Sequence, residues 1–212
     1  GRAKAFDFVS SAAVCSSTVG PSVVAAARDM LPYLAGLHFG YAQSKCVAEA
    51  LVRAAAGRGL PTTIHRPSLI AGSAATGLSN ADDLVSRIVK GCVEMGCAPD
   101  LDWPLDLCPV DFAARAIVRL SIDSPGPAGV THLANPNLRH WRDLVLWMNL
   151  FGFPLRLIPY RDWLDRLRVE GLRPGHALHA LTPFFTACTP DGLTLPELYE
   201  QSRRARLSDD ET

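Results

Sequence analysis

The sequence predicts an α/β fold built around parallel strands, followed by a smaller and mainly helical region. Three segments near the start carry this prediction: a short strand, a long helix and a second strand, at residues 5–10, 41–56 and 62–66. The first strand is short, apolar and followed by small residues, as buried parallel strands are. A strand, a helix and a strand in direct succession favour a unit in which the two strands run parallel.

In the segment between the first strand and the long helix, the hydrophobic residues do not recur at one regular spacing. Residues 15–39 are a long connection, which we expect to be partly helical from Val23 to Leu34. The helix that opens at Tyr41 is expected to end near Ala56, because Gly57 and Gly59 follow and glycine commonly terminates helices.

Charged residues within the helix and the next strand have ordinary structural interpretations. Glu49 and Arg53 are four residues apart, a spacing at which opposite charges support the exposed face of a helix. His65 lies in the strand at residues 62–66 and is most simply a strand residue.

Beyond Gly72 the pattern changes from a strand–helix alternation to a series of helices. We therefore divide the chain into residues 1–72 and an interleaved second domain, 73–212, with Asn80 and Asp111 as expected helix N-caps. Trp141 and Trp147 are expected on the core face of their helix. The expected elements of the second domain are helices at 81–91, 112–120, 141–151, 160–168 and 195–206 and a strand at 129–133.

The composition is that of a globular protein with balanced charge. Of the 212 residues 48% are hydrophobic, and 21 basic side chains balance 21 acidic ones. This balance argues against a nucleic-acid partner, because phosphate-binding surfaces need a basic excess. There is no apolar run of membrane-spanning length and no secretory signal at the start, so we expect a cytoplasmic protein that does not bind membranes.

Cysteines and histidines do not form a metal-binding pattern. The six cysteines lack the spacing of metal ligands, and Cys92 and Cys97 make a poor zinc knuckle. His176 and His179 stand three residues apart but have no acidic partner at a suitable spacing. We therefore expect no metal site and mostly buried, reduced thiols.

The chemistry-bearing motif is Tyr41-x-x-x-Lys45, which follows the strand that ends in Ser10 and Ser11. A tyrosine and a lysine four apart lie one above the other on a helix face. There the lysine ammonium favours the phenolate form of the tyrosine electrostatically. A serine hydroxyl at a neighbouring strand end could hold a carbonyl oxygen while the tyrosine gives it a proton. These residues suit the reduction of a carbonyl by hydride from a nicotinamide cofactor.

The order of these motifs resembles the second half of the nucleotide-binding domain of extended short-chain dehydrogenases/reductases. Gly40 to Val52, Gly59 to Pro67 and the stretch from Asn80 to Asp111 are similar in particular to thioester reductase (R) domains of polyketide and nonribosomal peptide synthetases. The resemblance covers roughly residues 5 to 165. It implies the second half of a Rossmann-like parallel sheet with a smaller, mainly helical substrate-binding subdomain.

What the resemblance implies is NADPH-dependent release of an acyl or peptidyl thioester from a carrier protein's phosphopantetheine arm, as an aldehyde or further as an alcohol. Carried onto this sequence, the catalytic residues are Ser11, which takes a position often held by threonine, with Tyr41 as proton donor and Lys45 in support. Lys45 would also touch the nicotinamide ribose. The expected cofactor-binding residues are Ser10, Tyr41, Lys45, Arg66, Pro67 and Ser68, and Ser10 is also the alternative to Ser11 if the strand register differs by one.

The sequence departs from the family in one respect. No Gly-rich G-x-x-G-x-x-G loop occurs in it, although this loop holds the pyrophosphate of the cofactor. We therefore expect the C-terminal half of a reductase, inactive without an N-terminal half that is its further partner.

Three alternatives remain open at the level of the sequence. The first is another extended short-chain enzyme acting on a small alcohol or a nucleotide sugar, which would not need the stretch from Asn80 to Asp111. The second is a release domain that cyclises its substrate without redox chemistry; such domains typically lose the tyrosine, whereas Tyr41 is present. The third is a non-catalytic docking module, which the missing phosphate loop favours.

Overall fold

The computed structural model describes residues 4–123, 129–201 and 205–208. The chain divides into two compact units, each described here by itself. Unit 1 is drawn from residues 1–77, 106–136 and 203–212, and unit 2 from residues 78–105 and 137–202. Each unit is therefore assembled from segments that are far apart in the sequence.

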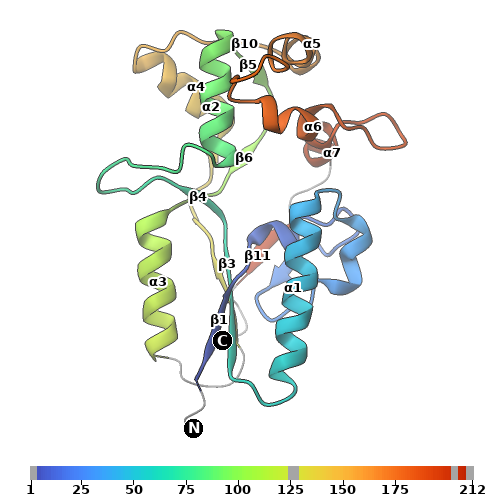
Figure 1. The fold of residues 1–212 in the computed structure, drawn as a ribbon, viewed down its shortest axis with the longest axis vertical. Coiled ribbons are helices and arrows are strands. Elements are labelled where there is room, and N and C mark those ends of the chain that lie inside the picture. Colours follow the sequence, from blue (N-terminus) through green and yellow to red (C-terminus); the bar gives the residue numbers. More distant parts are fainter. Residues whose placement is uncertain (1–3, 124–128, 202–204, 209–212) are drawn as a thin grey trace. The chain divides into compact units, whose positions relative to one another are not determined.

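The centre of unit 1 is a three-stranded parallel sheet with the strand order β1–β3–β8. Its strands are β1 (Phe6–Val9), β3 (Thr62–Pro67) and β8 (Gly129–Leu133). Val9 pairs with His65, and Pro67 pairs with Leu133. The helices α1 (Gly40–Ala56) and α3 (Val110–Asp123) cover opposite faces of this sheet (Figure 1). The predicted α/β class with parallel strands is confirmed.

The long helix α1 forms because its sequence is rich in alanine and other good helix formers. It stops at Gly57, and Gly59 follows with a φ of +94°, a left-handed conformation that favours glycine. Ala42 and Cys46 on its inner face pack into an apolar cluster with Val14, Cys15, Val24, Met30 and Leu37. The prediction of a helix that ends near residue 56 is confirmed.

The connection between β1 and α1 contains two 3-10 helices and one strand: η1 (Ala12–Cys15), β2 (Val23–Ala25) and η2 (Leu31–Gly36). The connection is therefore partly helical, as predicted, but its helical part is the 3-10 helix that begins at Leu31, and the expectation is wrong at Val23–Ala25, which form a strand. The β-branched Val23 and Val24 favour a strand, and β2 finds a parallel partner in β11 (Arg206–Ser208). The predicted helix over 195–206 is too long, because Arg206 begins β11; the described helix is α7 (Leu195–Gln201), and residues 202–204 lie outside the described residues.

Unit 1 also contains a separate pair of short strands. β4 (Leu69–Ala71) pairs in parallel with β7 (Leu107–Pro109). The sequence-based division assigned α3 and β8 to the second domain, and the structure corrects this, since both belong to unit 1. The reason is that β8 completes the parallel sheet by pairing with β3, a contact that spans more than sixty residues of sequence.

Unit 2 is mainly helical and has a core of large side chains that includes Trp163, Leu164, Leu167 and Phe185. β5 (Cys97–Asp100) pairs in parallel with β10 (Arg156–Pro159), and β6 (Pro104–Leu105) pairs antiparallel with β9 (Arg139–His140). Its elements are α2 (Leu84–Met95), β5 (Cys97–Asp100), β6 (Pro104–Leu105), β9 (Arg139–His140), α4 (Trp141–Leu150), β10 (Arg156–Pro159), α5 (Tyr160–Glu170), η3 (His179–Leu181), α6 (Thr182–Thr186) and α7.

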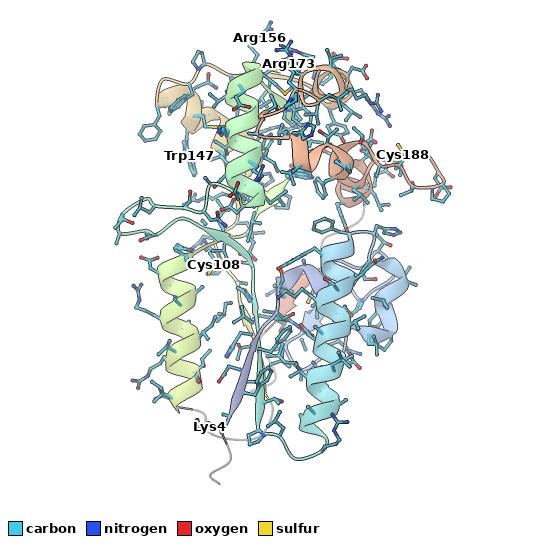
Figure 2. The ribbon with its side chains drawn as sticks, in the orientation of Figure 1. Lys4, Cys108, Trp147, Arg156, Arg173 and Cys188 are labelled. Carbon is cyan, nitrogen blue, oxygen red and sulfur yellow. The ribbon has the colours of Figure 1, made fainter. Side chains whose placement is uncertain are left out.

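Several local predictions in this region need correction. α2 begins three residues later than predicted, and its N-cap is Asp83, whose carboxylate accepts a 2.7 Å hydrogen bond from the N–H of Ser86. Trp141 is buried, as predicted, and its indole N–H donates to the Pro99 carbonyl. Trp147 instead lies on the outside of α4, 37% exposed (Figure 2), because only one face of this helix is covered by unit 2.

Among the described residues, no helix has the length and apolar character needed to cross a membrane. Those residues also contain no group of three or more His, Cys, Asp or Glu side chains that could hold a metal ion. All six cysteines are described; each is a free thiol, and all except Cys188 are buried. His176 lies near Glu94, and the His179 ring contacts the Gly171 carbonyl, so both histidines have structural partners.

Candidate active site

Helix α1 carries Tyr41 and Lys45 one turn apart. Tyr41 lies in the first turn and is 47% exposed, so it is accessible to a ligand. The Lys45 ammonium donates a 2.9 Å hydrogen bond to the carbonyl oxygen of Val9, the last residue of β1. The same nitrogen lies 5.1 Å from the centre of the Phe8 ring and 6.0 Å from the centre of the Tyr41 ring. Lys45 therefore connects the tyrosine with the carboxyl end of β1.

The two serines that follow β1 are held in different ways. The Ser11 hydroxyl accepts a 3.2 Å hydrogen bond from the N–H of Ala13 and so caps η1. The main-chain N–H of Ser10 donates to the His65 carbonyl and extends the pairing of β1 with β3. The Ser10 side chain is buried, and its hydroxyl has no hydrogen-bond partner among the described residues.

A second unsatisfied hydroxyl lies at the end of β3. Ser68 follows Pro67, the last residue of that strand, and its N–H donates to the Leu133 carbonyl. The Ser68 hydroxyl is also buried without a partner among the residues that the structure describes. An unsatisfied buried polar group costs about 1–3 kcal/mol, which a ligand atom could relieve. Because open α/β sheets bind ligands at the carboxyl ends of their strands, these hydroxyls fit a cofactor at this edge.

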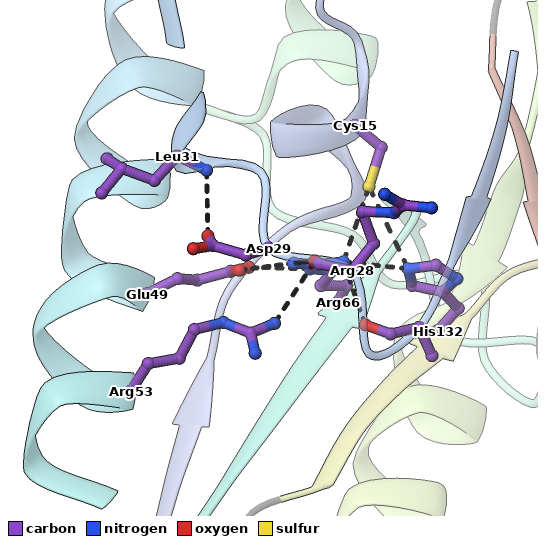
Figure 3. A network of polar contacts seen from close by, with 9 residues as sticks. Cys15, Arg28, Asp29, Leu31, Glu49, Arg53, Arg66 and His132 are labelled. Carbon is purple, nitrogen blue, oxygen red and sulfur yellow. Dashed lines mark hydrogen bonds and ion pairs between the residues drawn. The ribbon is translucent and has the colours of Figure 1, made fainter. Parts of the chain in front are cut away.

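Arg66 is fully buried and differs from Ser10 and Ser68 because the polar atoms of its side chain already have partners. Its guanidinium forms two hydrogen bonds with the Glu49 carboxylate, of 2.9 and 2.6 Å (Figure 3). The guanidinium is therefore engaged inside unit 1. The predicted cofactor contact of Arg66 stays a prediction, and it can involve only the main-chain atoms of this residue.

Glu49 corrects another prediction, since it lies on the buried face of α1 and pairs with Arg66 rather than with Arg53. The sequence shows both charged residues, Glu49 in the helix and Arg66 in the next strand, but no spacing pairs them. Burial of both partners depends on the distant segments that cover them, and this information was absent from local spacing.

Two further side chains of this buried network had no signal in the sequence. The Arg66 guanidinium lies 3.3 Å from Nε2 of His132 on β8 and 3.9 Å from the sulfur of Cys15. Burial raises the pKa of the Cys15 thiol to about 11. Cys15 is therefore protonated near neutral pH, and a protonated thiol is a poor nucleophile.

Comparison with known proteins adds independent information about this chain. Residues 1–117 match the family of male sterility proteins, an NAD-binding family. The chain is 34% identical over 210 residues to the non-canonical nonribosomal peptide synthetase FrzA of a Cladobotryum species, covering 94% of this chain and 20% of that protein. It is 32% identical over 226 residues to the large subunit of L-2-aminoadipate reductase of Eremothecium gossypii, covering 99% of this chain and 16% of that protein. The chain therefore spans only a small part of the length of these relatives.

A solved structure gives the same result for the fold. The terminal R domain from the myxalamid PKS-NRPS biosynthetic pathway superposes with a TM-score of 0.79 at 39% identity, over 90% of this chain. The chain spans 48% of that domain, about half its length. The chain therefore belongs to the male sterility family of NAD-binding domains, and its resemblance to the reductase domains of polyketide and nonribosomal peptide synthetases, within the extended short-chain dehydrogenase/reductase superfamily, is confirmed.

Proposed function

We propose that this chain is the catalytic part of a reductase that releases a carrier-bound acyl or peptidyl thioester as an aldehyde, with further reduction to an alcohol as an extension of the same chemistry. The observation that carries the proposal is the hydrogen bond from Lys45 to Val9, which links the Tyr41 helix to the strand that ends at Ser10 and Ser11. Membership in an NAD-binding family and similarity to reductases support it.

In this proposal Ser11 and Tyr41 donate hydrogen bonds to the substrate carbonyl oxygen, where negative charge develops. NADPH, when bound, supplies the hydride that reduces the thioester carbon. Tyr41 transfers its proton to the oxygen, which gives a thiohemiacetal. The carbon–sulfur bond then breaks and the hydroxyl proton passes to sulfur, so the products are an aldehyde and the free phosphopantetheine thiol. General acid catalysis of this kind contributes roughly 10²- to 10⁴-fold.

The cofactor would be held by the carboxyl ends of β1 and β3. The buried hydroxyls of Ser10 and Ser68, which lack partners among the described residues, support this assignment. Lys45 and Tyr41 would contact the nicotinamide ribose, and Arg66 and Pro67 would contribute main-chain atoms. Preference for NADPH over NADH is part of the proposal and rests on the reductase resemblance.

Two partners belong to the proposal. The first is the Gly-rich half of the reductase domain: β1 pairs with β3 alone among the described strands, so its other edge is available to a further strand. The second is an acyl or peptidyl carrier protein, supported by the synthetase context of the similar proteins. Unit 2 would bind the substrate, and the free thiols support a reducing, cytoplasmic location.

The test is a titration of NADPH into this chain alone and into the chain combined with the Gly-rich half, followed by NADPH oxidation on a carrier-bound acyl thioester. We expect binding and thioester-dependent oxidation only in the combined protein. Tyr41→Phe should abolish oxidation and leave folding and NADPH affinity nearly unchanged. Tyr33→Phe, which removes the same atom from another tyrosine of unit 1, should keep the rate. A Tyr41→Phe protein with close to full activity, or no NADPH binding in either sample, would overturn the proposal.

A further inference from the structure

The tyrosine helix is attached to the sheet at a second point, which lies inside the protein. The two oxygens of Glu49 on α1 accept hydrogen bonds of 2.9 and 2.6 Å from Nε and Nη2 of Arg66 on β3 (Figure 3). Arg66 is fully buried and Glu49 is 2% exposed. Such a two-pronged contact between planar groups fixes their relative orientation as well as their distance.

The same guanidinium also holds the segment that follows β2. Its Nη1 donates to the carbonyl oxygen of Ala26 at 3.3 Å, and its Nη2 donates to that of Arg28 at 3.0 Å. Arg53, one turn after Glu49 on α1, donates a further 3.3 Å hydrogen bond to the Arg28 carbonyl. The Arg66 guanidinium therefore has hydrogen-bond partners both on α1 and on the segment after β2, and these restrict rotation of its side chain.

The position of this pair relative to the proposed catalytic residues is specific. Tyr41, Lys45 and Glu49 follow one another at intervals of four residues on α1. Lys45 is attached to Val9 on β1, and Glu49 is attached to Arg66 on β3. Because Val9 pairs with His65, the two attachment points lie at nearly the same level of adjacent strands. Two such attachments oppose both rotation and sliding of the helix that carries Tyr41.

Stability alone does not explain a buried ion pair at this place. Taking two charges out of water is costly, and replacing a buried pair by apolar side chains of similar size is often neutral or stabilising. What an apolar pair cannot supply is a defined orientation. Resting on the function proposed above, we propose that Glu49 and Arg66 are a positioning pair, whose side chains set the orientation of Tyr41 for proton transfer without touching substrate or cofactor.

The test is a double-mutant cycle of Glu49 with Tyr41 in the full-length reductase on a carrier-bound acyl thioester. Steady-state kcat and KM are the readout, and single-turnover rates replace them where turnover is lost. Glu49→Gln should lower kcat about 10- to 100-fold, since a displacement of about 1 Å costs rates of this order. The KM for NADPH should change less than about threefold. Tyr41→Phe should abolish steady-state turnover, so the comparison in that background uses the residual single-turnover rate. The same substitution should lower this rate less than about twofold, because the group it positions is already gone. Equal losses in both backgrounds, or unchanged kcat, would overturn the inference.

Two further variants separate orientation from charge. Arg66→Lys keeps the positive charge but loses the planar fork, so kcat should fall about as far as in Glu49→Gln. Recovery of full kcat by Arg66→Lys would show that charge balance alone matters and would contradict a positioning role. Asp123→Asn is the control: it makes the same carboxylate-to-amide change in an exposed pair with Arg119 on α3, and kcat should stay unchanged.

A variant with an apolar pair covers the case in which Glu49→Gln does not fold. In Glu49→Met/Arg66→Met no buried charge is left alone, so the thermal midpoint should be close to that of the parent while kcat still falls. If this double variant keeps full kcat, or if it also fails to fold, the pair serves the fold and the inference is wrong. A different result would overturn the proposed function, namely a Tyr41→Phe protein with full activity. If Tyr41→Phe is inactive but Glu49→Gln keeps the parent's kcat, only the positioning role is overturned.

Discussion

The ammonium of Lys45 and the carbonyl oxygen of Val9 are 2.9 Å apart, and this single hydrogen bond ties the tyrosine helix to the strand that precedes Ser10 and Ser11. The contact orients the lysine before any cofactor arrives. The same side chain is proposed to meet the nicotinamide ribose, so it serves the structure and the ligand together.

Replacing Lys45 should therefore affect binding and rate at once. We expect Lys45→Ala to weaken NADPH affinity and to lower kcat, each by about tenfold or more, because hydrogen bonds to charged groups contribute about 1.5–3 kcal/mol. Cofactor titration and steady-state rates measure the two effects. Lys90→Ala, which alters an exposed lysine of α2 paired with Glu94, is the control. A Lys45→Ala protein that loses rate but binds NADPH normally would contradict the proposed ribose contact.

Substitution of the two serines after β1 should affect stability differently. Ser11→Ala removes the cap of η1 and should cost about 1 kcal/mol of unfolding free energy together with most of the rate. Ser10→Ala removes a hydroxyl that has no partner among the described residues, so stability should be unchanged or higher while NADPH affinity falls. Urea unfolding and NADPH titration of both variants test this assignment; loss of rate in Ser10→Ala alone would transfer the catalytic role to Ser10.

The stability of unit 1 should depend on pH through Asp7. Burial alone would raise the pKa of the Asp7 carboxyl, but hydrogen bonds from His65 and Ser121 outweigh it and lower the pKa below its ordinary value. A lowered folded-state pKa means that the stabilisation is present above the unfolded-state pKa of about 3.9 and disappears as pH falls through the folded-state value.

We therefore expect Asp7→Asn to lower the unfolding free energy at pH 6 and to have a progressively smaller effect as pH falls below about 4. Urea unfolding of both proteins between pH 3 and 6 measures the difference. A destabilisation that stays constant over this range would show that the ionised carboxylate is not responsible.

Replacing Gly91 on α2 should lower the stability of unit 2, because there is no room for a side chain at this position. A Cβ atom at this position would overlap the side chain of Leu178, which is fully buried in the same unit. Alanine in place of glycine favours a helix by up to about 1 kcal/mol, but overpacking a core typically costs about 1–3 kcal/mol. Gly91→Ala should therefore lower the thermal midpoint.

In a Leu178→Ala background the overlapping side chain is gone. Gly91→Ala should therefore lower the thermal midpoint less in that background than it does in the parent. Gly57→Ala is a suitable comparison, since Gly57 has an ordinary φ of −61° and an added Cβ would meet only atoms at normal contact distance. If Gly91→Ala is as stable as the parent, Leu178 moves aside at little cost.

The parts of the fold that could be predicted from sequence are those with a strong local signal. β1 and α1 follow from a short, largely apolar run and an alanine-rich helix, and β3 follows from the β-branched residues Thr62–Ile64 directly after the glycines that end the helix. The spacing of Tyr41 and Lys45 likewise needs only the geometry of one helix. Their relation to Ser10 and Ser11 follows from chain order together with parallel pairing.

The remainder depended on partners that are distant in sequence. Val23–Ala25 is a strand because residues 206–208 pair with it, and no window around Val23 contains that partner. Glu49 is buried because Arg66 and the segment after β2 enclose it, so the spacing to Arg53 was misleading. The error at Asn80 is of a different kind: several neighbouring residues have side chains that can cap a helix, and Asp83 is the one used.

The order in which the segments of unit 1 occur has a consequence for protein synthesis. The chain leaves this unit after residue 77, returns to it for residues 106–136, and contributes its last strand to it only at residues 206–208. On the ribosome, β2 therefore has to wait for its partner until all of unit 2 has been made. The apolar cluster that contains Ala42 and Cys46 of α1 is likewise completed only when Leu207 packs against it. Because both units are discontinuous in sequence, neither can be produced as one continuous fragment of the chain.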